Sequence, residues 1–419
     1  MKRNTRRNFL KTTAGTAALL GTAPYGFAVQ RRVLRVLGTH VTLQESLRQQ
    51  AQEDLGIAIE FQPGGSASIA HQASTRPESF DLYEQWSNSI RVLWQAGTIQ
   101  PIETSRLANW NEINNLTKTG RLTSEAKLGA GDAPNKLLFV QEDGSLGGDI
   151  AERISYLPYV HNVDSFGYDA AQIDRGIPYE TEGWGWLLDR KWSGRVALVN
   201  EPTIGLFDAA LAAQDMGLAQ FDDIGNMTKS EIDALFRVLV DLRRDGHFRG
   251  VWSSVPHSVE LMKSGEVAIE SMFSPGVFAL KAGGIDCIYA SPKSGYRAWH
   301  GVMCLSAQTT GASKDMAYEY MNWWLSGWPG AFIARQGYYI SNPQRSKEFL
   351  SEDEWNYWYE GQPAQSDLKG TDDRIVVQKG DSRDGGSYEK RFSNIAVWNT
   401  VMDNYEYTLN AWNEFLSAV

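Results

Sequence analysis

Short apolar runs alternate with amphipathic segments in the first part of the chain. The apolar runs predict strands at residues 32–38, 57–61 and 80–83. Amphipathic segments at residues 43–54 and 87–95 predict helices, and a turn at residues 63–66 offers Ser66 as a further helix N-cap. Gly56 and Gly97 come soon after the two helical segments, where glycine commonly ends a helix. This strand–helix order is typical of a parallel α/β sheet.

A second alternating block begins near Tyr156. A buried strand is expected at residues 195–199, an Ala-rich helix at 204–216, and strands after 265–269 and at 287–289. The clearest amphipathic helix is predicted at 229–244, because its apolar residues share one face: Ile232, Leu235, Val238, Leu239 and Leu242. Thr228 and Glu231 have capping-box spacing ahead of this helix, and Gly246 follows its end.

Three segments outside the two alternating blocks have other sequence patterns. Residues 114–150 are polar and Gly-rich, which predicts an insertion or an extended surface loop. A helix is expected at 316–325, and the chain after Pro343 is expected to be helical and aromatic. A charged, Gly-rich stretch at 379–386 interrupts that last part. Together the two alternating blocks predict an α/β protein of more than one domain.

The first 28 residues have the pattern of a signal peptide rather than of the fold. Five basic residues and no acid precede or flank a short, weakly apolar stretch, and small residues suit cleavage after Ala28. Arg6 and Arg7, followed by Phe9-Leu10-Lys11, form a twin-arginine motif. The apolar run is too short for a membrane span, which needs about 20 residues. We therefore expect export to the periplasm by the twin-arginine route.

Removal of that segment makes the chain strongly acidic. The whole sequence holds 40 basic and 50 acidic residues, and the 391 residues after Ala28 keep 35 of the basic ones, for a net charge near −15. An acidic surface disfavours nucleic acid and anionic membranes as partners. It suits a cationic or zwitterionic ligand, although a solvated acidic surface explains it equally well.

The residues that common cofactors and catalytic sites require are scarce. Cys287 and Cys304 are the only cysteines, too few for an iron–sulfur cluster or a zinc–thiolate site, so no cofactor is expected. The two thiols either form a disulfide or stay free on buried strands. The six histidines are scattered, and the sequence contains no nucleophile elbow, zinc-protease motif or P-loop.

Five segments, in their order and spacing, resemble one known family. They are residues 156–159 with Asn162 and Gly167, residues 184–188 followed by 191–197, residues 261–269, residues 292–299 and residues 336–343. The chain resembles the extracytoplasmic solute-binding proteins of ABC importers, of the spermidine/putrescine-binding type. Such proteins are binders rather than enzymes, and the resemblance implies a small-molecule ligand, an inner-membrane permease as partner, and a monomer.

The resemblance implies a two-lobed periplasmic-binding-protein fold with ligand held between two α/β lobes. Lobe 1 is expected to comprise residues 29–158 and 302–342, and lobe 2 residues 159–301 and 343–419. The hinge crossings are expected near Tyr159 and at residues 299–302. The resemblance implies Tyr83 and Trp86 at the cleft edge, Glu201 as the acid for an amine, and Phe273, Trp299 and Tyr338 as aromatic walls. Arg297, which departs from the family pattern, is a further candidate ligand-binding residue.

The chain departs from the polyamine-binding pattern at three positions. Ser294 and Gly301 stand where the family places acids, and Arg297 has appeared close by. An arginine repels a polyamine but clamps a carboxylate, unless it pairs with a structural acid instead. A polyamine-like cation is expected, and a monoamine, a betaine or an amino-acid-like zwitterion is the alternative; the turn at residues 63–68 could then receive a carboxylate.

Two further classes stay open from the residues alone. Abundant acids and aromatic residues also suit an exported carbohydrate-active enzyme with paired carboxylates. A ferric-ion binder on the same fold would need clustered tyrosines, for which Tyr338 and Tyr339 are the candidate pair.

Overall fold

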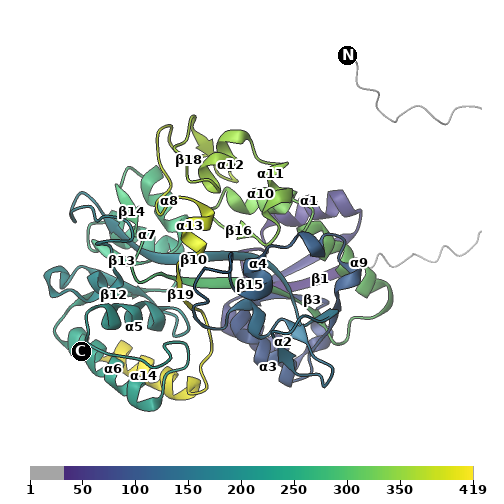
Figure 1. The fold of residues 1–419 in the computed structure, drawn as a ribbon, viewed down its shortest axis with the longest axis horizontal. Helices are drawn as coiled ribbons and strands as arrows, with labels where there is room; N and C mark the ends of the chain where they lie inside the picture. The colour runs from purple at the N-terminus through teal and green to yellow at the C-terminus, as the bar shows by residue number, and fades with distance from the viewer. Residues whose placement is uncertain (1–32, 419) are drawn as a thin grey trace, which may run out of the picture. The chain divides into compact units, whose positions relative to one another are not determined.

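The computed structural model of the protein describes residues 33–418. The predicted signal peptide, residues 1–28, lies outside the described residues. Within them, two blocks of strands and helices are connected by two long strands (Figure 1). Among the helices of residues 33–418, none combines the length and apolar character that a membrane span requires.

The first block is built from three parallel strands and their helices. Its elements are β1 (Val33–Gly38), α1 (Glu45–Leu55), β2 (Ala58–Pro63), α2 (Ser66–Thr75), β3 (Leu82–Trp86) and α3 (Ile90–Gln95). Strand β1 pairs in parallel with both β2 and β3, which confirms the predicted parallel α/β pattern. Helix α1 ends as expected at Gly56, whose φ of 68° is a conformation that favours glycine. Ser66 is not an N-cap, because α2 begins with it and Gly65 takes that place.

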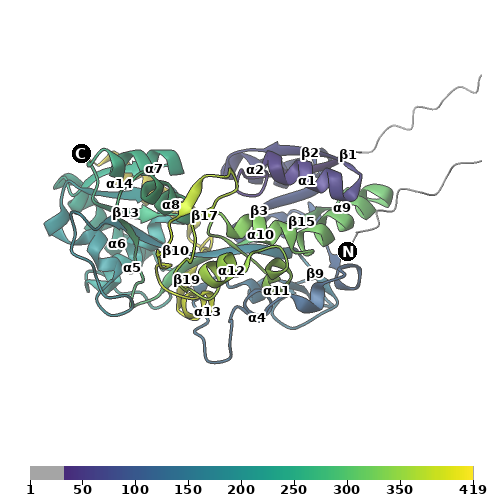
Figure 2. The same ribbon diagram turned by 90° about the horizontal axis from the view of Figure 1, so that it is seen from above.

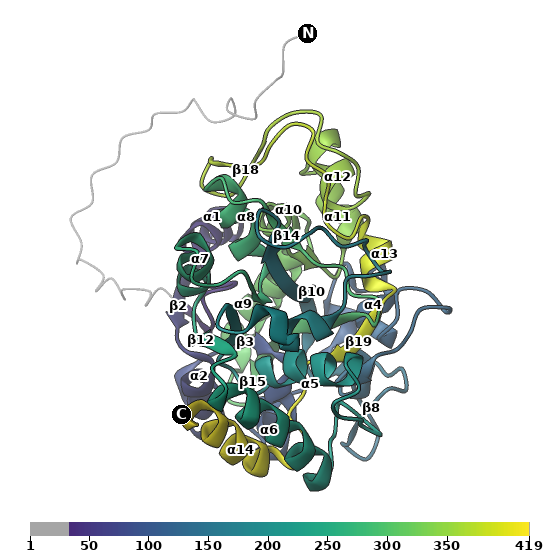
Figure 3. The ribbon, with the colours of Figure 1, turned by 90° about the vertical axis from the view of Figure 1, so that its left-hand side faces the viewer.

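The second block repeats this construction. Its elements are β11 (Val196–Val199), α5 (Gly205–Asp215), α6 (Lys229–Arg244), β12 (Phe248–Trp252), α7 (Val255–Lys263), β13 (Ile269–Met272), α8 (Ser274–Ala282) and β14 (Cys287–Tyr289). Strand β11 pairs in parallel with β12 and β13. The capping box of α6 is confirmed, with Thr228 and Glu231 bonded reciprocally. Figure 3 shows α14 (Tyr405–Ser417) beside α6 on the outside of this block.

Two long antiparallel strands join the blocks into one sheet. They are β10 (Leu157–Asp169) and β15 (Tyr296–Ser306), and every residue in both is buried. Strand β10 pairs with β13 at residues 165–168, whereas β15 pairs with β3 at residues 301–305. The sheet order is therefore β12-β11-β13-β10-β15-β3-β1-β2. Figure 2 shows β10 and β15 in the middle of the molecule, between the two blocks. The expected crossings, near Tyr159 and at residues 299–302, lie within these strands.

The remaining elements cover this junction. They are β4 (Ile99–Gln100), β5 (Ile102–Glu103), α4 (Asn115–Thr119), β6 (Ala130–Gly131), β7 (Phe139–Val140), β8 (Leu146–Gly147), β9 (Arg153–Ile154), α9 (Gly311–Trp324), α10 (Trp328–Ala334), β16 (Tyr339–Ile340), α11 (Pro343–Lys347), α12 (Glu352–Trp358), β17 (Leu368–Lys369), β18 (Ile375–Val377), α13 (Tyr388–Phe392) and β19 (Ile395–Trp398). Residues 114–150 are thus more than a loop, because β7 joins a small sheet and β6 pairs with β19. The chain after residue 343 contains strands as well as the expected helices.

Separate hydrophobic cores fill the blocks and the junction. One core packs the first block with α9 and α10, and another packs the second block with α14. A third core lies against the middle of β10 and β15 and draws mainly on residues 355–398. The predicted lobe boundaries, residues 29–158 and 302–342 for lobe 1 and residues 159–301 and 343–419 for lobe 2, stay a prediction. Cys287 and Cys304 are free, buried thiols that belong to different cores.

Candidate ligand-binding site

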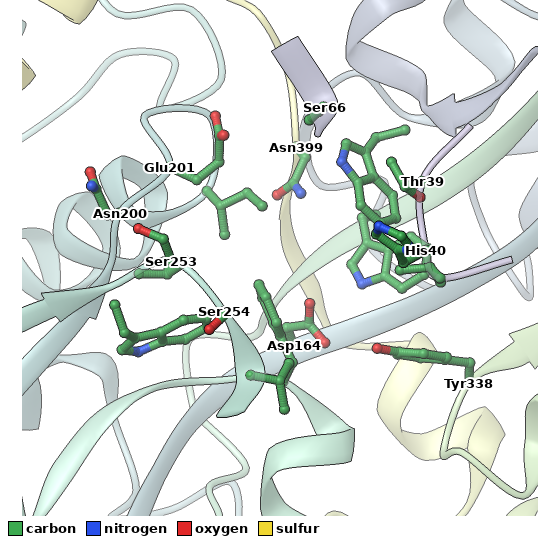
Figure 4. A pocket seen from close by; sticks show the side chains of 18 of the residues that line it. Thr39, His40, Ser66, Asp164, Asn200, Glu201, Ser253, Ser254, Tyr338 and Asn399 are labelled. Carbon is green, nitrogen blue, oxygen red and sulfur yellow. The ribbon is translucent and has the colours of Figure 1, made fainter. Parts of the chain in front are cut away.

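A cavity of about 370 Å³ lies where the carboxyl ends of the parallel strands meet. The ends of β1, β2 and β3 contribute Thr39, His40, Val41, Gly64, Ser66 and Trp86. The ends of β11, β12 and β13 contribute Val199, Asn200, Glu201, Ile204, Trp252, Ser253, Ser254, Val255 and Phe273. Because each parallel strand turns into a helix at this edge, the fold collects loops here, which is where open α/β sheets bind ligands. The remaining lining residues are Asp164, Trp299, Tyr338 and Asn399 (Figure 4).

Aromatic rings form two facing groups around this cavity. Trp299 lies between Trp86, at 5.1 Å between ring centroids, and Tyr338, at 5.4 Å, and both contacts are edge-to-face. Trp252 and Phe273, from the second block, form another edge-to-face pair at 5.1 Å. These perpendicular contacts hold the rings rigidly, which is the favoured geometry of aromatic pairs. The cavity therefore has pre-formed apolar walls from both blocks.

Glu201 contributes a carboxylate from the loop that starts α5. Its backbone oxygen accepts hydrogen bonds from the amides of Ile204 and Gly205, at 2.9 and 2.7 Å. Its side-chain Oε1 accepts from the amide and the hydroxyl of Thr203, at 3.2 and 2.9 Å. The turn thus fixes one carboxylate oxygen, and among the described residues none bonds the other, which stays available to a ligand.

Asp164 contributes a second carboxylate from the middle of β10. It is 1% exposed, and its Oδ1 accepts a hydrogen bond from the Tyr289 hydroxyl at 3.0 Å. Figure 4 shows the hydroxyl of Tyr338 directed toward it. Burial raises the pKa of Asp164 to about 6, although the neighbouring Arg297 guanidinium opposes that rise. The cavity floor therefore carries an acid that titrates near neutral pH.

Arg297 lies beneath that floor instead of lining it. It is the register partner of Asp164 on β15 and is fully buried. Its Nε lies 2.6 Å from Oδ1 of Asp208, and its Nη1 lies 3.5 Å from Oδ2 of Asp164 and 3.2 Å from the side-chain oxygen of Asn399. Arg297 therefore has the role of a structural ion-pair partner in this geometry, and it holds the two acids together.

The structure brings five of the seven predicted site residues to the cavity. Those five are Trp86, Glu201, Phe273, Trp299 and Tyr338. Tyr83 and Arg297 do not line it. Tyr83 is fully buried, accepts a hydrogen bond from Gln85 and packs against Phe80. Along β3, neighbouring side chains alternate between faces, so Trp86 and Tyr83 point to opposite sides.

Most of the other lining residues were not predicted from the sequence, and Trp252, Asp164 and Asn399 show why. Trp252 ends β12, a strand that the pattern analysis did not identify because it is short and half polar. Asp164 lies inside a long buried strand, where an acid gives no local signal. Asn399 reaches the site only because β19 pairs with β15. For Trp252, the sequence does contain a signal: Trp252, Ser253 and Ser254 directly precede a helix.

Comparisons with known proteins agree with this architecture. The sequence profile of the family described as "Bacterial extracellular solute-binding protein" matches residues 46–355. No curated protein sequence matches the chain. Among solved structures, the spermidine/putrescine ABC transporter substrate-binding protein PotD from Streptococcus pneumoniae is 14% identical, with a TM-score of 0.61 and coverage of 92% of this chain and 98% of that one.

Two further structures are similar over the same span. The Tp0655 (TpPotD) lipoprotein of Treponema pallidum is 11% identical, with a TM-score of 0.63 and coverage of 92% and 99% of the two chains. MotA from A. tumefaciens B6, solved in complex with glucopine, is 12% identical, with a TM-score of 0.58 and coverage of 92% and 100%. The fold is thus the expected two-lobed α/β fold, and the profile match over most of the sequence shows that the chain belongs to the bacterial extracellular solute-binding protein family.

Proposed function

We propose that this chain is the substrate-binding component of an ABC importer and that its cavity captures a small nitrogen-containing cation of the polyamine-like class. Membership of an extracellular solute-binding family supports the binding role. Several of the similar structures carry the names of ABC transporter proteins. Their named ligands differ, since spermidine/putrescine and glucopine both occur among them, so the ligand class has to be argued from the cavity.

The observation that carries the proposal is the chemistry of the cavity lining. It comprises four large aromatic rings and a phenol together with two carboxylates, and among the described residues that line it none is Lys or Arg. An ammonium group over an aromatic face gains roughly 0.5–2 kcal/mol, and a carboxylate adds charge-assisted hydrogen bonds. An anion would meet the Glu201 carboxylate with no cation in the lining, because the Arg297 guanidinium lies beneath the floor and pairs with Asp164 and Asp208. The lining therefore favours a cationic ligand.

A zwitterion, betaine or amino-acid-like, is the second candidate, and one feature favours it. Helices α2 and α7 begin at the cavity, where Gly64, Ser66 and Ser254 line it. Helix N-termini attract carboxylates through their free amides. Arg297 does not support this candidate, because its guanidinium forms ion pairs with Asp164 and Asp208 and does not line the cavity.

The other two classes receive less support. A carbohydrate-active enzyme does not agree with membership of a solute-binding family. A ferric-ion site would need Tyr338 and Tyr339 to converge, yet Tyr338 lines the cavity while the Tyr339 hydroxyl donates to the backbone oxygen of Trp358 in the third core.

Calorimetric titration distinguishes the two leading classes. Putrescine should bind better than a betaine or γ-aminobutyrate, and Glu201→Gln should weaken putrescine binding strongly because it removes the charge from the free carboxylate oxygen. Glu352→Gln, an exposed acid on α12, is the matched control and should leave affinity unchanged. Tighter binding of the zwitterions, with loss of affinity in Ser254→Ala, would replace the cation proposal.

Export is a separate part of the proposal. The twin-arginine motif at Arg6 and Arg7 implies that the chain reaches the periplasm already folded. The solute-binding family implies that it works there with a membrane permease, and we propose that it does so as a monomer. Replacing both arginines by lysine should leave the precursor in the cytoplasm, as seen by fractionation and immunoblotting. Normal processing of that double variant would argue for another export route.

A further inference from the structure

A second, smaller cavity lies behind the binding cavity, between α8, α12 and the segment that leads into α13. Its lining includes Lys281, Arg383, Asp384 and Arg391, with Val277 and Phe278 as an apolar wall. It has room for about one water-sized sphere. Three cations and one carboxylate give this lining a net charge of +2.

The single carboxylate of this cavity, that of Asp384, already forms an ion pair with Lys281. Oδ2 of Asp384 lies 2.8 Å from Nζ of Lys281 and also accepts a hydrogen bond from the Tyr289 amide at 3.1 Å. Among the described residues, no Asp or Glu forms an ion pair with Arg383 or Arg391. The next buried acids, Asp164 and Asp208, pair with Arg297. Two guanidinium groups are therefore left without an ion-pair partner among the described residues.

Most hydrogen bonds from the Arg383 and Arg391 guanidinium groups go to uncharged oxygen atoms. Both guanidinium groups donate to the Tyr339 hydroxyl, from Nε of Arg383 at 2.8 Å and from Nη1 of Arg391 at 3.3 Å. Arg383 also donates to the Gly337 oxygen, and Arg391 to the Val163 oxygen. Nε of Arg391 has no partner among the described residues, although the side chain is 1% exposed. An unused donor on a buried charge is costly.

Aromatic faces compensate only part of this charge. Arg383 lies 4.9 Å from the ring centroid of Trp358 and 5.4 Å from that of Tyr339, whereas Arg391 lies 5.6 Å from that of Tyr296. Such contacts contribute roughly 0.5–2 kcal/mol each, whereas burial of an unpaired ion costs several kcal/mol. Because the aromatic contacts do not offset the cost of burying these two positive charges, a bound anion would stabilise this region.

We propose that this cavity binds one small monovalent anion of the halide class, held between Arg383 and Arg391. The small free space favours a monatomic ion over phosphate, sulfate and carboxylates, each of which has several heavy atoms. The wall of Val277 and Phe278 suits a weakly hydrated ion. The site does not depend on the ligand proposed above.

The position of this site connects it to the binding cavity. Arg391 bonds Val163, the neighbour of Asp164 on β10, and Arg383 bonds Gly337, the neighbour of Tyr338. A bound halide would neutralise cations directly behind two residues of the cavity wall. It would thereby brace that wall and lower the positive potential that a cationic ligand meets.

Bromide is the probe for this site, because it replaces chloride and scatters anomalously. Crystals of the full chain grown in sodium bromide should show an anomalous peak between the two guanidinium groups. In solution, the melting temperature should be about 2 °C higher in sodium chloride than in sodium gluconate at equal ionic strength. Arg383→Gln should abolish that difference, whereas Arg175→Gln, at an exposed ion pair with Asp286, should keep it.

The crystals and the melting temperatures each give a result that either supports or overturns the anion proposal. A peak at the site, with a chloride-dependent melting temperature, establishes the anion. Bromide crystals without a peak there, or equal melting temperatures of the wild-type chain in the two salts, overturn the proposal and leave a water in the cavity. If Arg383→Gln fails to fold, these two wild-type measurements still decide the question.

Discussion

Trp299 lies at the centre of the three-ring group on one wall of the cavity. Its ring contacts both Trp86 and Tyr338, so removal of the indole takes away one ligand-facing surface and the support of two others. We expect Trp299→Ala to weaken ligand binding at least about tenfold, which corresponds to a loss of roughly 2 kcal/mol. Calorimetry with the best-binding amine measures this change.

A matched tryptophan elsewhere separates binding from folding. Trp94 is half-buried on α3, away from the cavity, and its indole donates to the Gly144 oxygen. Trp94→Ala should reduce stability but not affinity, while Trp299→Phe should retain more affinity than Trp299→Ala. Undiminished binding in Trp299→Ala would mean that the ligand occupies another site.

Asp164 makes the binding of a cation sensitive to pH. Burial raises its pKa to about 6, with Arg297 opposing the rise, so the carboxylate takes up a proton between pH 7 and pH 5. Affinity for a cation should therefore fall by up to about tenfold over that range. The effect on stability has the opposite sign: between about pH 4 and pH 6 the folded chain holds this proton more tightly than the unfolded chain, which favours folding as the pH falls.

Two variants test this assignment by titration at both pH values. Asp164→Asn should bind weakly and with little dependence on pH. Glu84→Gln is the control, because burial also raises the pKa of Glu84, to about 7, but that residue bonds Tyr159 in the first core and does not line the cavity. If affinity lost its pH dependence in Glu84→Gln but not in Asp164→Asn, the titrating group would be Glu84 in the first core rather than Asp164 in the cavity.

At this scale, the residue type alone did not decide which side chains reach the cavity. Trp86, Trp299 and Tyr338 were placed by resemblance to a family whose strand ends hold the site. Arg297 does not line the cavity, because its partners, Asp164 and Asp208, come from distant segments and hold the guanidinium under the floor. Such pairing depends on the tertiary fold and has no signature in the local sequence.

Among the elements, α6 shows most clearly how sequence determines a helix. Thr228 Oγ1 accepts a hydrogen bond from the amide of Glu231, and the Glu231 side chain accepts one from the amide of Thr228. Thr228→Ala removes one of these bonds and should lower the free energy of unfolding by about 1 kcal/mol. Chemical denaturation measures the change, with Ser74→Ala, a half-buried serine in the last turn of α2, as the control. Equal losses in the two variants would show that the capping box contributes nothing specific.

Periodic helices and apolar strands were predictable because their signal lies within a few residues. The strands β12 and β19 were missed, since each is short and acquires its identity from pairing with a distant strand. The long strands β10 and β15 were expected only as hinge crossings, through the resemblance. The joining of two blocks into one sheet depends on the register Asp164↔Arg297 and its neighbours, which no local pattern encodes.

On the scale of the whole molecule, the two blocks meet across the cavity as well as through the sheet. Asn88, in the first block, lies 3.4 Å from the Thr203 hydroxyl in the second block, and that hydroxyl lies 2.9 Å from Oε1 of Glu201. A ligand amine on Glu201 would engage the same group of side chains. The described conformation therefore places a link between the blocks directly beside a candidate ligand contact.

We expect ligand to stabilise this link by rotating the lobes toward each other about β10 and β15. Small-angle scattering should show a smaller radius of gyration when the best-binding amine is added at saturation. Asn88→Ala should weaken affinity several-fold, because a typical hydrogen bond contributes about 0.5–1.5 kcal/mol to the closed form, while Asn115→Ala, an exposed residue of α4, should not. Identical scattering curves with and without saturating ligand would argue against a hinged binder, since closure of two lobes on a ligand makes the particle more compact.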